Sequence, residues 1–145
     1  MYELLKPVEK RDNWIFILDH TIEFGNQKCL LILGITLERF MENRCLIKHE
    51  DMDVLQIEIT SKTNSDRILK TLKKLVKQTG VPKQIISDYG GDIKRAVRLF
   101  CDKYNKTTYS YDVTHKCALL LKHMLQNDER WGSFIKACLK QNERF

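Results

Sequence analysis

The stretch that most constrains the fold is residues 29–35, which read Cys-Leu-Leu-Ile-Leu-Gly-Ile without a polar side chain. A strand with apolar side chains on both faces has to be covered on both faces. We therefore interpret residues 28–36 as a strand, and we expect its sheet to lie between helices.

Four further segments have the composition of strands. Residues 14–21 and 83–87 contain short apolar runs rich in β-branched side chains, which is typical of buried strands. Residues 53–60 alternate between apolar and polar side chains, as a half-exposed edge strand does. The threonines and tyrosines of residues 107–114 favour a fifth strand. A hairpin turn within residues 23–27 would join the first two strands.

Apolar side chains at helical spacing predict four helices. They are one that Asn64 or Ser65 caps and Gly80 ends, one from Asp92 to about Tyr104, one over residues 116–126, and one that Asp128 caps. Residues 37–51 fit neither pattern and are interpreted as an irregular excursion. Strands in succession, followed by strands that alternate with helices, predict an α/β fold with a mixed five-stranded sheet and helices on both faces.

The bulk composition is ordinary for a globular protein, with 43% hydrophobic and 30% charged residues. Residues 1–13 are interpreted as a lead-in segment and residues 14–145 as one domain. No apolar run approaches the roughly 20 residues of a membrane helix, so no membrane partner is expected. The five cysteines form no CxxC pair and indicate reduced thiols. A zinc site from Cys117, His115 and His123 is conceivable, but its spacing fits no established pattern.

Two aspartates each end one of the short apolar runs. Asp19 follows residues 14–18, and Asp88 follows residues 84–87. A helix-capping role would suit Asp92, whereas Asp19 precedes more strand-like sequence and caps nothing obvious. Carboxylates delivered by adjacent strand ends are the oxygen ligands that a hard divalent cation needs. We therefore predict that Asp19 and Asp88 are catalytic metal ligands for Mg²⁺ or Mn²⁺.

The formal net charge of +6 and the sequence pI of about 9.1 favour a polyanionic partner. Basic residues gather in the first predicted helix and after the second aspartate. The candidate DNA-binding residues are Arg67, Lys70, Lys73, Lys74, Lys77, Lys94, Arg95 and Arg98.

A third aspartate begins the motif Asp112-Val113-Thr114-His115 after the fifth predicted strand. With Asp19 and Asp88 in the same chain order, this motif resembles the catalytic core of DDE transposases. It is similar to the Cys-or-Asp, two residues, His signature of Mutator-like and hAT-like elements and related bacterial insertion-sequence transposases. The resemblance covers residues 14–145. It implies a ribonuclease H-like fold with strand order 3-2-1-4-5 and an antiparallel second strand.

The resemblance also implies two-metal phosphoryl transfer, which cleaves DNA and joins strands. Asp19 and Asp88 would hold the ions, while Asp112 and His115 would have supporting roles. The partners would be transposon ends and target DNA, with homo-oligomers of the full-length protein. Such a protein would be cytoplasmic and nucleoid-associated in a bacterium, or nuclear in a eukaryote.

One departure from that family concerns its third acidic ligand, because residues 116–126 contain no acidic side chain. We expect that the domain is incomplete at its C-terminus and that the missing ligand lies beyond residue 145. Glu129 and Glu143 are the late substitutes.

Three alternatives remain. The chain could be a catalytically inactive, transposase-derived DNA-binding module. It could also be another ribonuclease H-like nuclease, such as a resolvase, that completes its site with Asp112. A phosphate-binding α/β enzyme using residues 87–91 is the third, although no P-loop is present.

Overall fold

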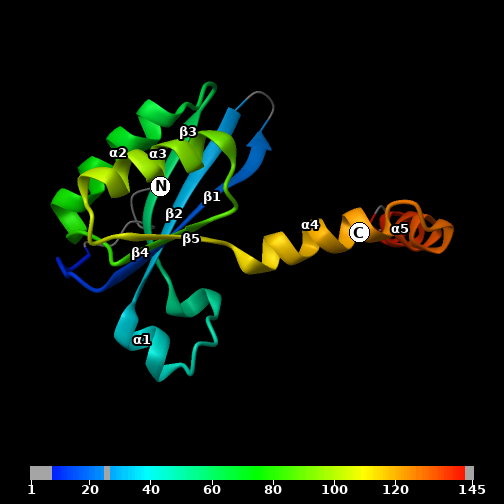
Figure 1. The fold of residues 1–145 in the computed structure, drawn as a ribbon, viewed down its shortest axis with the longest axis horizontal. Coiled ribbons are helices and arrows are strands. Elements are labelled where there is room, and N and C mark those ends of the chain that lie inside the picture. The colour runs from blue at the N-terminus through cyan, green and yellow to red at the C-terminus, as the bar shows by residue number, and fades with distance from the viewer. Residues whose placement is uncertain (1–7, 25–26, 143–145) are drawn as a thin grey trace. The chain divides into compact units, whose positions relative to one another are not determined.

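The computed structural model describes residues 8–24 and 27–142 (Figure 1). The predicted turn at Gly25 and Asn26 lies outside the described residues. The chain divides into two compact units, Met1–Asp112 and Val113–Phe145. Each unit is therefore described by itself.

The described strands of the first unit form one five-stranded sheet in the order β3-β2-β1-β4-β5. The strands are β1 (Trp14–Phe24), β2 (Gln27–Thr36), β3 (Asp53–Thr60), β4 (Gln84–Ser87) and β5 (Thr108–Tyr111). β2 runs antiparallel to both β1 and β3, whereas β1, β4 and β5 are parallel to one another. This strand order and these directions confirm the predicted ribonuclease H-like sheet.

The core lies between one face of the sheet and two helices, α2 (Ser65–Thr79) and α3 (Gly91–Lys103). Side chains alternate along a strand, so Phe16 and Leu18 of β1 enter this core together. They meet the apolar stripe of each helix, including Leu72 of α2 and Phe100 of α3. Figure 1 shows both helices on the same side of the sheet. Full burial of one such side chain stabilises the fold by about 1.5–3 kcal/mol.

The opposite face of the sheet is also apolar, as residues 29–35 predicted. Ile15 and Ile35 are buried there but do not belong to the core that contains α2 and α3. Ile17, Leu31 and Leu33 are only half-buried. Because α2 and α3 share the first face, helical cover of the opposite face stays a prediction.

The ends of α2 follow the predicted chemistry. The side-chain oxygen of Asn64 accepts the Arg67 amide over 2.9 Å at the start of the helix. Gly80 ends the helix with a φ of 88°, and a β-carbon there would overlap the carbonyl oxygen of Arg11. The Arg11 amide in turn donates to the Thr79 carbonyl over 2.8 Å. Residues 8–13 are therefore attached to the end of α2.

Three local predictions were wrong. Residues 37–51 contain α1 (Leu37–Glu42) and the 3₁₀ helix η1 (His49–Asp51), because Thr36 and Asp51 side chains accept amides at their starts. Helix α3 begins at Gly91, with Gly90 at its N-cap, so Asp92 lies in the first turn and does not cap it. Strand β5 ends at Tyr111, and the following residues enter a helix.

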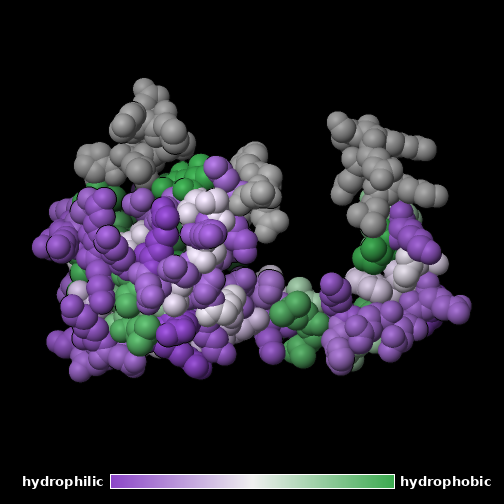
Figure 2. All heavy atoms as spheres, turned by 90° about the horizontal axis from the view of Figure 1, so that it is seen from above, coloured by the Kyte–Doolittle hydropathy of each residue, from purple (hydrophilic) through white to green (hydrophobic). Residues whose placement is uncertain are grey.

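The second unit contains α4 (Val113–Leu125) and α5 (Glu129–Asn142). The carboxylate of Asp128 accepts the Arg130 amide over 2.9 Å, as expected for a residue that caps α5. Leu120, Leu121 and Met124 of α4 are exposed, and Figure 2 shows hydrophobic side chains at the surface of this unit. Among the residues that the structure describes, no helix has the length and apolar character to span a membrane.

Candidate active site

The pairing register places three aspartates in one row at the carboxyl edge of the sheet. Leu18 of β1 pairs with Ser87 of β4, and Ser87 pairs with Tyr111 of β5. The residue that follows each member of this row is an aspartate: Asp19, Asp88 and Asp112. The Asp112 amide donates to the Ser87 carbonyl over 2.8 Å, so the hydrogen bonds between β4 and β5 continue to this edge.

Asp19 and Asp88 have different surroundings. Asp19 is exposed and lies on the face opposite to its buried neighbour Leu18. Asp88 is half-buried, and its Oδ1 accepts the Gly90 amide over 2.9 Å. A β-carbon at Gly90 would lie 3.3 Å from that oxygen, closer than most β-carbon contacts. The turn therefore favours glycine at position 90 and orients the Asp88 carboxylate.

The described residues contain no group of three or more His, Cys, Asp or Glu side chains that could hold a metal ion. The three aspartates of the row are thus not gathered into a metal cage, and neither are Cys117, His115 and His123. The donor chemistry of Asp19 and Asp88 fits a hard cation, but two carboxylates are fewer than the predicted mechanism uses. The metal role of Asp19 and Asp88 stays a prediction.

His20 lies at the same edge and was not predicted to be functional. Its Nε2 is 3.4 Å from Thr63 Oγ1, and its ring is half-buried. Burial and then Lys28 lower the pKa of His20, while Asp88, Asp92 and Asp19 act in the opposite direction. The sequence signal was its position directly after Asp19, on the strand face that carries Leu18.

A cluster of tyrosines supports the turn after Asp88. Tyr89 has a φ of 62°, a left-handed conformation that is uncommon outside glycine. Its ring centroid lies 4.5 Å from that of Tyr109 and 4.6 Å from that of Tyr111. The Tyr109 hydroxyl is 2.7 Å from Ser87 Oγ, and burial raises the pKa of Tyr109 to about 12, against a smaller opposing effect of that hydrogen bond. Tyr109 therefore remains neutral at ordinary pH.

The supporting residues of the motif fall on different units. Asp112 is half-buried and is the last residue of the first unit. His115 is exposed on α4 of the second unit. The predicted supporting roles of Asp112 and His115 stay predictions.

The candidate DNA-binding residues all lie on α2 and α3, which pack against each other. Most are exposed: Arg67, Lys70, Lys74, Lys77, Arg95 and Arg98, with Lys73 and Lys94 half-buried. Figure 2 shows a mostly hydrophilic surface on the first unit.

Two of these basic residues have partners within the protein. Arg67 Nε forms an ion pair with the Glu58 carboxylate. Burial would raise the pKa of Glu58, but hydrogen bonds from Thr71 and Arg67 together with the Arg67 charge outweigh it, and the pKa is lowered. The Lys94 ammonium lies 5.2 Å from the centroid of the Tyr89 ring.

Comparisons with known proteins give structural matches only. No protein-family model and no curated protein matches the chain. The HTLV-2 integrase catalytic core domain in complex with magnesium is 16% identical in its dimeric form, with a TM-score of 0.46, over 84% of this chain and 79% of that one. Its trimeric form is 17% identical, with a TM-score of 0.47, over 81% and 75%.

A third match is a chain of the simian T-cell lymphotropic virus intasome in complex with PP2A regulatory subunit B56 gamma. It is 13% identical, with a TM-score of 0.46, over 72% of this chain. The protein spans about a third of the length of that chain, 34%.

Proposed function

We propose that this chain is the catalytic core, or part of the core, of a DDE-type transposase or integrase. The observation that carries the proposal is the row formed by Asp19 and Asp88, which follow paired residues of adjacent parallel strands. Carboxylates side by side on adjacent parallel strands of a ribonuclease H-like sheet suit phosphoryl transfer, because this reaction needs charge stabilisation and positioning.

A divalent metal fits the chemistry of this edge. Bound Mg²⁺ or Mn²⁺ would supply Lewis-acid activation of the attacking oxygen and stabilise the leaving oxygen. Asp19 and Asp88 would hold it with carboxylate oxygens, the ligands that both ions prefer. Two carboxylates are fewer than this mechanism uses, so we expect weak metal binding and no strand transfer from these residues alone.

The surroundings of Asp19 and Asp88 would favour metal binding by these two carboxylates. The Gly90 amide fixes Oδ1 of Asp88 and thereby the direction of its second oxygen. Asp19 is exposed and can approach an ion without a large desolvation cost. Asp112 and His115 would support the site as in Mutator-like and hAT-like transposases.

The substrate would be DNA. The exposed lysines and arginines of α2 and α3 would contact phosphates and give sequence-independent affinity. Transposon ends and target DNA would be the partners, and the full-length protein would form homo-oligomers.

Thermal melting with and without Mn²⁺ tests the metal site. Two carboxylates at one edge repel each other, so Asp19→Asn or Asp88→Asn should leave metal-free stability unchanged or raise it. The ion should stabilise the parent protein by mass action and neither variant. A parent whose melting temperature ignores Mn²⁺, with both variants destabilised, would show that the aspartates are structural.

Two other functions have specific support. A DNA-binding module without catalysis is favoured by the lack of a three-residue metal group among the described residues. A resolvase-like nuclease is favoured by the place of Asp112 in the row. Metal-dependent cleavage of four-way junctions without strand joining would identify the nuclease, whereas salt-sensitive DNA binding without any cleavage would identify the module.

A further inference from the structure

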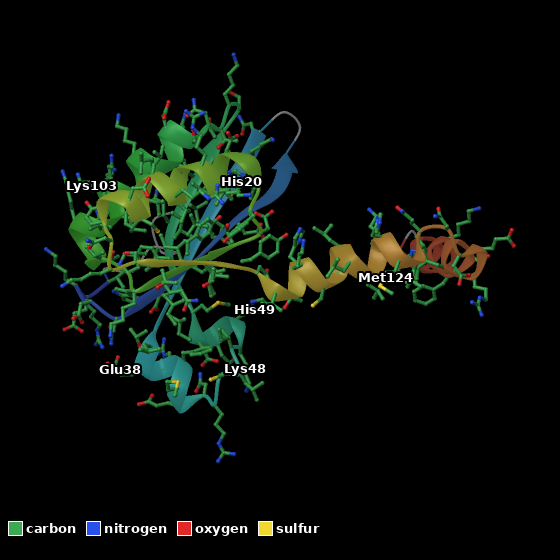
Figure 3. The ribbon with its side chains drawn as sticks, in the orientation of Figure 1. His20, Glu38, Lys48, His49, Lys103 and Met124 are labelled. Atoms are coloured by element: carbon green, nitrogen blue, oxygen red, sulfur yellow. The ribbon has the colours of Figure 1, made fainter. Side chains whose placement is uncertain are left out.

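Besides the basic side chains of α2 and α3, the protein has a second basic surface. It lies at the edge of the sheet opposite to the row of three aspartates. A hollow at the amino ends of β4 and β5 is lined by Lys83, Lys103, Tyr104, Lys106 and Thr108, among others. Asp88 and Asp112 follow the carboxyl ends of β4 and β5, and Asp19 of β1 lies level with them, so all three lie at the other edge. Figure 3 labels Lys103 at the C-terminal end of α3 and, well apart from it, His20 of β1, which neighbours Asp19.

Backbone hydrogen bonds hold the walls of this hollow in place. The Thr108 amide donates to the Lys83 carbonyl over 2.8 Å, and the Thr107 amide donates to the Tyr104 carbonyl over 2.9 Å. The buried Thr107 hydroxyl donates to the Pro82 carbonyl over 2.7 Å. The three segments that carry the lysines are thus tied together before any ligand arrives.

The charge of the hollow is one-sided. Lys83, Lys103 and Lys106 are exposed, and Asp12 is the one carboxylate among the residues that line it. Within the described part of the chain, none of these lysines forms an ion pair. Three ammonium groups against one carboxylate favour a ligand that carries more than one negative charge.

Tyr104 gives the hollow an aromatic wall. Its ring packs against fully buried Phe100, with ring centroids 4.5 Å apart and an angle of 35° between the planes. The Lys103 ammonium lies 5.6 Å from the Tyr104 centroid, within the range of a cation–π contact. Phe100 therefore fixes the Tyr104 ring on the core, and the Lys103 ammonium lies beside that ring.

We propose that this hollow binds an unpaired segment of nucleic acid. One base would stack on Tyr104, and the neighbouring phosphates would lie near Lys83, Lys103 and Lys106. An aromatic ring beside lysines suits single strands, since their bases are free to stack, whereas a duplex offers only its phosphates to such a surface. The inference goes beyond the metal chemistry and requires neither Asp19 nor Asp88.

Binding of fluorescent oligothymidylate and of a duplex of equal length, both with a chelator present, tests the proposal. Tyr104→Leu should weaken single-strand binding by roughly fivefold or more, because stacking is lost, and should change duplex binding by less than about twofold. Tyr104→Phe keeps the ring and should bind as the parent does. The Phe variant keeps the test decisive if Tyr104→Leu lowers stability.

The lysines are tested by Lys83→Gln combined with Lys106→Gln, against Lys62→Gln as an exposed lysine outside the hollow. In the double variant, the slope of log single-strand affinity against log salt should become shallower by about 1.4, near 0.7 for each lost phosphate contact. Two results would overturn the proposal: equal single-strand affinity in Tyr104→Leu and Tyr104→Phe, or an equal loss of single-strand affinity in Lys62→Gln and in the double variant. The chelator excludes metal-dependent effects, so a failure here and a failure of the proposed transposase function are separate results.

Discussion

The backbone amide of Gly90 donates to Oδ1 of Asp88 over 2.9 Å, so one oxygen of this carboxylate has a structural partner before any metal binds. The same side chain therefore serves the turn into α3 and the proposed metal site. The two roles can be separated, because an amide side chain keeps the acceptor oxygen but loses the charge.

Asp88→Asn and Asp88→Ala should differ in stability without metal. Asn retains an acceptor for the Gly90 amide. Ala leaves this amide without an acceptor and should lower the free energy of unfolding by about 1 kcal/mol. Both variants should lose the response to Mn²⁺. Chemical denaturation with and without the ion measures both effects, and equal stability of Asp88→Ala and the parent would contradict the structural role.

Gly80→Ala should destabilise the first unit by at least about 2 kcal/mol, since alanine is strained at a φ of 88° and its β-carbon would overlap the Arg11 carbonyl oxygen. Gly91→Ala is the matched control, because no atom lies within 4 Å of a β-carbon there. That substitution, in the first turn of α3, should be neutral or stabilising by up to about 1 kcal/mol. Urea denaturation of the three proteins measures the difference. A loss in Gly91→Ala as large as in Gly80→Ala would remove the steric explanation.

Lys70→Gln and Arg67→Gln should affect duplex DNA binding unequally. Both side chains are exposed on α2, but Arg67 forms an ion pair with Glu58. Replacing Lys70 should reduce the slope of log affinity against log salt by about 0.9, one phosphate contact, and replacing Arg67 should reduce it less. Salt titrations of the parent and both variants provide the slopes. Binding that does not change between low and physiological salt would remove nucleic acid as a partner.

Tyr109 should make the protein less stable at strongly alkaline pH. Its pKa is raised from 10.0 to about 12, so the folded state favours the neutral phenol. The contribution of the neutral phenol to the free energy of unfolding is fully present below pH 10. It is lost as the pH rises from 10 towards 12. Compared with Tyr109→Phe, the parent should lose about 1–2 kcal/mol over this window, a value reduced for the partial exposure of Tyr109. Denaturation at several pH values measures the difference, and parallel stability curves for the two proteins would rule out the shift.

Much of the fold could be predicted because the placement of apolar side chains in the sequence agrees with the tertiary structure. They alternate with polar ones in strands and recur at helical spacing in helices. The boundaries of β3, and of α2 between Asn64 and Gly80, are as predicted. The error after β5 has a physical cause. Val113 and Thr114 have strand-forming side chains, yet they begin α4, because strand propensity is a weak preference that context overrides.

The candidate site was predictable in part. Asp19 and Asp88 could be identified because each follows a short apolar run, a local signal, although β1 continues past Asp19 to Phe24. The tyrosine cluster could not, because Tyr89 meets Tyr109 only through the register of β4 and β5 and the left-handed turn at Tyr89. The place of His20 beside Thr63 likewise depends on the packing of segments that are far apart in the chain.

The attachment of residues 8–13 to the end of α2 has a practical consequence for shortened versions of this protein. Val8 packs against the core, and Arg11 closes the turn at Gly80. A version that begins at the first strand, Trp14, would remove both and leave the Thr79 carbonyl without its donor. Expression and crystallisation trials should therefore start the domain ahead of Val8, and a tag fused directly to Trp14 should lower the yield of folded material.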